Sequence, residues 1–187
     1  RTLDKSDSPL DPHVFTPTLK LKPWDKQNQL YGLGRDSAKI RDVLTVFESE
    51  PEYANPQTLM EVAQLYAQVG DYKSAARYYY AANLRRAFDA RRFPASDIPP
   101  LDGGGWGASV GAWVADSSAR MHTVANDVRA WDARVPYRYH PGYRVPQGSL
   151  NTTIPDESEW PDLLAQTRTD FFKSLDDIAK GLASMGK

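Results

Sequence analysis

The sequence predicts an all-α fold: a bundle of about five helices preceded by an extended arm. Three observations lead to this prediction. Apolar residues recur at intervals of three and four along five segments, which is the period of an amphipathic helix. Prolines and glycines cluster between these segments, and no stretch shows the pattern of a β-hairpin. Hydrophobic residues make up 41% of the 187 residues, enough for one packed core. We therefore expect a single helical domain over residues 35–187.

An extended, proline-rich arm is expected over residues 1–34. Its prolines at positions 9, 12, 17 and 23 remove backbone donors and restrict the residues before them. The arm also carries apolar side chains that are able to hold it on a core, namely Val14, Phe15, Leu19, Leu21 and Trp24. Two interpretations stay open: a strap that belongs to the fold, or an arm that binds a partner.

The five helices are expected at residues 37–49, 56–70, 72–91, 108–133 and 159–185. Asp36 or Ser37 is a suitable cap for the first helix. Asn55 is the expected cap of the second, with Pro56 at the first helical position, where a missing N–H costs nothing. Pro161 lies in the first turn of the last helix, where proline is tolerated.

The two long C-terminal helices each show an apolar stripe that is typical of a core-facing surface. The stripe over 108–133 consists of Val110, Trp113, Ser117, Met121, Val124, Val128 and Trp131. The stripe of the last helix consists of Trp160, Leu164, Thr167, Phe171, Leu175, Ile178 and Leu182. Before the first of them, the stretch "LDGGGWG" (101–107) predicts a flexible turn. It lacks the Lys and Ser/Thr of a phosphate-binding loop.

The helices around Gly70 and Asp71 have small and large residues at defined spacings. The pattern consists of Leu59, Val62, Ala63, Tyr66, Gly70, Asp71, Tyr72, Ala75, Tyr79 and Ala82. It resembles one tetratricopeptide unit, a helix–turn–helix of about 34 residues, over residues 56–92. Shifting the pattern by one unit in either direction fails, and Ala87 stands where the family has proline, so we expect one hairpin. The resemblance implies a protein-binding scaffold whose ligand face would carry Gln57, Met60, Gln64 and Gln68.

The stretch "LRRAFDARR" (84–92) is a first candidate binding surface. Arg85, Asp89 and Arg92 share one helix face and are spaced for local ion pairs. Arg86 and Arg91 are left for another partner. One interpretation is internal, because seven acidic residues lie between positions 156 and 177. The alternatives are an acidic surface of another protein and a phosphate ligand.

The stretch "YRYHPGY" (137–143) is a second candidate. Exposed Tyr, Arg and His in a stiff loop are typical of interface hot spots. The candidate partner-binding residues here are Tyr137, Arg138, Tyr139, His140 and Tyr143. The alternatives are rings that cover the end of the bundle, or a platform on which a sugar stacks.

Composition excludes several function classes. The balance of 23 basic and 24 acidic residues argues against nucleic acid as the main partner. No apolar run is long enough to span a membrane. The chain has no cysteine, and its three histidines lack metal-site spacing. We therefore expect neither a metal nor another cofactor, and the sequence shows no catalytic motif.

These observations favour a non-enzymatic protein-binding module. Its most concrete form is a bacterial immunity or adaptor protein that binds and neutralises a toxin or an effector of a secretion system. The alternatives are a structural subunit of an envelope assembly, and a helical hydrolase or glycan-active protein that uses the 137–143 loop. The chain begins with Arg1 instead of Met, so we expect an exported, periplasmic protein, with the cytoplasm as the alternative.

Overall fold

The computed structural model describes residues 39–94, 101, 103–139 and 154–187. This part of the chain folds into six α-helices and two short 3₁₀ helices, which confirms the all-α prediction. In chain order they are α2 (Ile40–Ser49), η4 (Pro51–Tyr53), α3 (Pro56–Gln68), α4 (Tyr72–Arg92), α5 (Gly104–Ala115), α6 (Ser118–Arg134), η5 (Glu157–Glu159) and α7 (Trp160–Ser184). The expected arm, the caps Asp36 and Ser37, and the loop residues His140 and Tyr143 lie outside the described residues.

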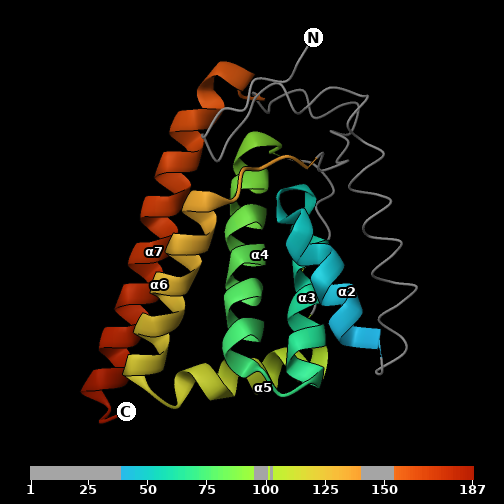
Figure 1. The fold of residues 1–187 in the computed structure, drawn as a ribbon. Coiled ribbons are helices and arrows are strands. Elements are labelled where there is room, and N and C mark those ends of the chain that lie inside the picture. Colours follow the sequence, from blue (N-terminus) through green and yellow to red (C-terminus); the bar gives the residue numbers. More distant parts are fainter. Residues whose placement is uncertain (1–38, 95–100, 102, 140–153) are drawn as a thin grey trace.

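Helix α4 lies at the centre of the bundle (Figure 1). It packs against α3 on one side and against α6 and α7 on the other, and α5 crosses one end. Helix α2 lies outside α3 and contacts it. Because α4 is surrounded in this way, residues on several of its faces are buried, including charged ones. No described helix combines the length and apolar character that a membrane crossing requires.

Helices α3 and α4 form the expected hairpin. Asn55 caps α3 by accepting a 2.8 Å hydrogen bond from the N–H of Thr58, and Pro56 is the first helical residue, both as predicted. Gly70 adopts a φ of 81°, a conformation that glycine reaches without steric cost, and this allows the tight turn. The small residues Ala63 and Ala75 are fully buried where the helices approach. The hairpin is therefore established, and its relationship to the tetratricopeptide family stays a prediction.

The prediction of one long helix over 108–133 is wrong, because the chain forms two helices there, α5 and α6. Helix α5 ends at Ala115, and Ser117 has an extended backbone with φ of −155°. The Ser117 hydroxyl accepts a hydrogen bond from the N–H of Arg120 and so caps α6. The glycine stretch also differs from the prediction of a flexible turn, because α5 begins at Gly104.

The apolar stripe of α7 is largely confirmed. Trp160, Leu164, Thr167, Leu175 and Leu182 are buried, as predicted. The prediction for Ile178 is wrong, because this residue is 47% exposed and the neighbouring Ala179 is buried instead.

Candidate functional site

The two predicted hot-spot tyrosines of the described chain are buried. Tyr137 and Tyr139 have no exposed surface, so the prediction that they form an exposed interface is wrong, and the alternative of rings packed on the bundle holds for them. The Tyr137 hydroxyl donates a 2.6 Å hydrogen bond to Oδ1 of Asp132, and the Tyr139 hydroxyl donates a 2.7 Å bond to Oδ1 of Asp89. The two rings are therefore buried in the fold, and each hydroxyl has a hydrogen-bond partner there.

These tyrosines belong to a buried polar cluster, which consists of Arg85, Asp89, Arg92, Asp132, Tyr137 and Tyr139. Arg92 donates to Oδ1 of Asp89 through Nε and Nη2, at 3.0 and 2.6 Å, which confirms the expected local pair. Arg85 does not complete that pair. It donates to the carbonyl of Ala54 at 2.6 Å instead, and its guanidinium lies over the Tyr137 ring at 4.4 Å. The cluster thus joins three segments that are far apart in the sequence.

Burial sets the protonation of the cluster. It raises the pKa of both Tyr137 and Tyr139 well above the ordinary value, so these phenols stay neutral donors at neutral pH. Burial also raises the pKa of the Asp89 carboxyl, whereas the charge of Arg92 and the hydrogen bond from Tyr139 act in the opposite direction and favour the carboxylate. All six side chains are buried and most of their hydrogen bonds are made within the fold, so among the described residues the cluster forms part of the core.

The basic end of α4 meets the acidic helix α7, which was the internal interpretation. Arg91 forms a 2.5 Å ion pair with Asp170, and Phe88 near the end of α4 belongs to the same apolar cluster as Trp160 and Leu164 of α7. Arg86 is half-buried and makes contacts of its own. Arg138 is half-buried, and its backbone N–H donates to the carbonyl of Glu52 at 2.9 Å.

The ligand face that the tetratricopeptide resemblance implies is only partly accessible. Met60 is buried in the core, which contradicts its placement toward a groove. Gln57 and Gln64 are half-buried, and Gln68 is exposed at the end of α3. The structure therefore leaves Gln64 partly accessible and Gln68 exposed.

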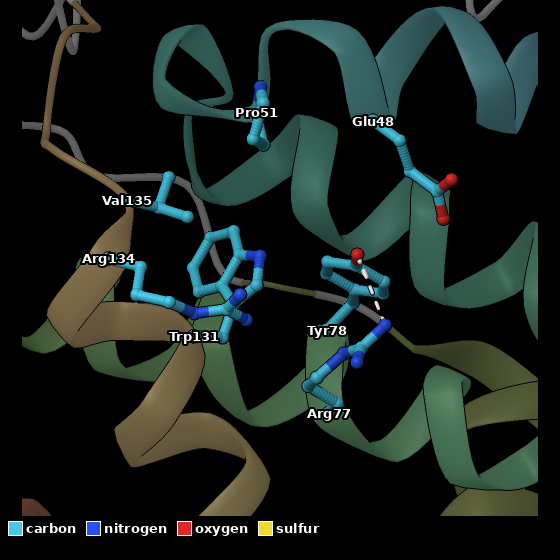
Figure 2. Close-up of a pocket in the computed structure, with 7 residues that line it drawn as sticks. All are labelled: Glu48, Pro51, Arg77, Tyr78, Trp131, Arg134 and Val135. Atoms are coloured by element: carbon cyan, nitrogen blue, oxygen red, sulfur yellow. Dashed lines mark hydrogen bonds between the residues drawn. The ribbon is translucent and has the colours of Figure 1, made fainter.

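A cleft lies elsewhere, where α2, η4, α4 and α6 meet (Figure 2). Its volume is about 360 Å³, which is in the usual range of ligand pockets. We call it the arginine cleft, and its lining residues are Glu48, Pro51, Arg77, Tyr78, Trp131, Arg134 and Val135. Glu48 comes from α2, Arg77 and Tyr78 from the second turn of α4, and Trp131 and Arg134 from the last turn of α6.

The aromatic rings of the arginine cleft are held rigidly. Tyr78 and Trp131 contact each other edge to face, with ring centroids 5.7 Å apart. Tyr78 also stacks on Tyr66, whose hydroxyl donates a hydrogen bond to the Glu48 carboxylate. Both Tyr78 and Trp131 are buried, so each ring presents only a small face to the cleft. The rings thus form a preformed apolar floor between charged groups.

The two arginines of the cleft differ from most others in the described chain. Arg91, Arg92, Arg120, Arg129 and Arg168 each form an ion pair with an aspartate. Within the described residues, neither Arg77 nor Arg134 has such a carboxylate. Arg77 donates through Nη2 to the Tyr78 hydroxyl at 3.3 Å, and Arg134 donates through Nε to the carbonyl of Ala130 at 3.0 Å. Two guanidinium groups without an ion-pair partner in the described chain therefore face one small cleft.

Sequence reasoning missed Arg77 and Arg134. A signal was present, because neither has an acidic residue three or four positions away on its helix. Arg92 has Asp89 at that spacing, and Arg120 has Asp116. However, only the packing of α6 beside α4 shows that the two unpaired arginines line the same cleft.

Comparisons with protein-family models, with curated proteins and with solved structures give no match for this chain.

Proposed function

We propose that this protein is a non-enzymatic protein-binding module and that the partner docks over the arginine cleft. The single observation that carries the proposal is the presence of Arg77 and Arg134, without carboxylate partners in the described chain, beside a rigid aromatic floor. Arginine and aromatic side chains are the residues that most often dominate binding at protein interfaces. Their helices are packed on the bundle, so little order has to be gained on binding.

The more specific version is a bacterial immunity or adaptor protein, in which the partner is a toxin or a secreted effector and the site of action is the periplasm. What supports it is the class of the molecule: a small, helical, cysteine-free chain with a preformed cleft. Immunity by occlusion requires only tight binding and no chemistry on the inhibitor's side.

The test is capture of the partner from an extract of the native host, with the tagged full chain as bait. The informative variant is the double substitution Arg77→Ala/Arg134→Ala. The matched control is Arg120→Ala, because Arg120 lies over the Trp113 ring at 4.9 Å much as Arg77 lies over Tyr78 at 4.7 Å, but outside the cleft.

We expect one stoichiometric protein on the wild type and on Arg120→Ala, and its loss from the double variant. Melting temperatures of all three proteins show whether each is folded. Equal retention of the same protein by the double variant would contradict docking at the cleft. A partner that proves to be a toxin or an effector supports the immunity version, whereas a component of an envelope assembly supports the structural alternative.

A further inference from the structure

We propose that the group recognised in the arginine cleft is a single carboxylate, supplied by an Asp or Glu side chain that lies next to an apolar residue in the partner protein. This inference rests on the proposed docking function and adds the chemistry of the anchor. It follows from the charge, the donors and the apolar surface of the cleft.

The net charge of the lining determines which ligand charge it binds best. Arg77 and Arg134 contribute two positive charges and Glu48 one negative charge, so the lining carries one net positive charge. A carboxylate with one negative charge neutralises it. A phosphate group carries close to two negative charges at neutral pH, and Glu48 would repel the excess. The cleft therefore matches a carboxylate better than a phosphate.

The hydrogen-bond donors set where the carboxylate binds. Within the described residues, Arg77 Nη1 has no hydrogen-bond partner and is not among the buried atoms, and the terminal nitrogens of Arg134 have no partner either. Burial raises the pKa of Tyr78, so its hydroxyl keeps its proton while it accepts the bond from Arg77. That proton has no acceptor in the described structure. Two guanidinium groups and one phenol thus offer donors to an acceptor that the protein itself does not supply.

The apolar part of the lining sets the neighbour of the acidic residue. Pro51 and Val135 stand on the same side of the cleft as Trp131 in Figure 2, and Trp131 and Tyr78 form its floor. Such a surface favours an aromatic or branched side chain beside the carboxylate, because burying it removes apolar area from water. The volume of about 360 Å³ accommodates side chains of a short segment and not a folded domain.

The experiment compares two capped tripeptides, acetyl-Phe-Asp-Val-amide and acetyl-Phe-Asn-Val-amide. They differ only in the central side chain, which ends in a carboxylate in Asp and in a neutral amide in Asn. Each is titrated into the full ¹⁵N-labelled chain, and the Nε–H signals of Arg77 and Arg134 and the indole N–H of Trp131 are followed by NMR. We expect saturable shifts with the Asp peptide and an affinity at least about tenfold lower for the Asn peptide, because a charge-assisted hydrogen bond is lost. The variants Arg77→Gln and Arg134→Gln should each lose the preference for Asp, and Arg120→Gln should keep it.

Three results would overturn the inference: no shifts at these signals, equal affinity for the two peptides, or tighter binding of inorganic phosphate than of the Asp peptide. The last result would replace the carboxylate by a phosphate. The outcome is separable from the capture experiment. Partner capture that depends on the cleft arginines, together with equal peptide affinities, removes the carboxylate anchor and leaves the docking function intact. Asp selectivity without cleft-dependent capture removes the docking function.

Discussion

The hydroxyl of Tyr139 donates a 2.7 Å hydrogen bond to Oδ1 of Asp89, and both side chains are fully buried. The residues are 50 positions apart, so this bond ties the segment after α6 to the last turns of α4. Arg92 binds the same carboxylate oxygen. Asp89 is therefore an acceptor shared by two segments of the chain, and the first two stability predictions concern its partners.

The substitution Tyr139→Phe removes one donor and keeps the ring. We expect it to lower the free energy of unfolding by about 1 to 3 kcal/mol, because a buried carboxylate loses a hydrogen bond that no water replaces. Urea unfolding measures the change. Tyr79→Phe is the matched control, since the Tyr79 ring is half-buried and its hydroxyl makes no hydrogen bond to the described residues. Equal stability of the two variants would show that the Tyr139 bond is not stabilising.

Arg92 and Asp89 should be strongly coupled. Removing one partner, as in Arg92→Leu, leaves a buried charge without its counter-ion, and we expect a loss of about 3 to 5 kcal/mol. The double variant Arg92→Leu/Asp89→Leu should cost less than the sum of the two single variants. A double-mutant cycle in urea measures this difference. Arg91→Leu is the control, because its ion pair with Asp170 is exposed and should matter far less. Additive single effects would contradict the coupling.

The exposed ion pair of Arg91 and Asp170 should contribute to the pH dependence of the free energy of unfolding at acidic pH. The hydrogen bond from Arg91 lowers the pKa of Asp170 below its ordinary value of 3.8. A carboxyl whose pKa is lower in the folded state stabilises the fold above its unfolded pKa and loses that contribution as the pH falls through the folded pKa. Between about pH 2 and 6, the free energy of unfolding should therefore fall less steeply with acidification for Asp170→Asn than for the wild type. An unchanged slope would show that the pair is not formed in solution.

Two glycines should respond to alanine in opposite directions. Gly70 has a φ of 81°, so Gly70→Ala strains the turn between α3 and α4, and we expect a loss of about 1 kcal/mol. Gly111 lies inside α5, and a Cβ added there meets no atom within 4 Å. Gly111→Ala should therefore stabilise the protein by about 0.5 to 1 kcal/mol. Thermal unfolding of both variants checks the two signs, and the same sign for both would contradict this account of the turn.

The helices could be predicted because their signals are local. The cap at Asn55 and the apolar period of α7 depend on residues within one or two turns. The break between α5 and α6 was missed, since the stripe of apolar residues continues past it and the cap is a single serine, Ser117. Such a cap is visible in the sequence only once the break is known.

The candidate site could not be predicted, because it depends on which helices are neighbours. An aromatic loop is typical of both interfaces and cores, and only the tertiary fold buries Tyr137 and Tyr139 against α4. Arg77 and Arg134 are 57 positions apart, and no local pattern connects them. Their common feature, the lack of an acidic residue three or four positions away, becomes informative only when α4 and α6 are known to be in contact.

The buried polar cluster has a consequence for how fast the protein unfolds. Its hydrogen bonds close chain segments of 31 and 50 residues, and closing long segments costs entropy before any contact is gained. We expect these bonds to form after the α3–α4 hairpin and to be absent from the folding transition state. Tyr139→Phe should then speed unfolding in stopped-flow experiments and leave the folding rate nearly unchanged. A slower folding rate with unchanged unfolding would place the cluster in the nucleus instead. With this order of events, the cluster determines the lifetime of the native state and contributes little to the speed with which it is reached.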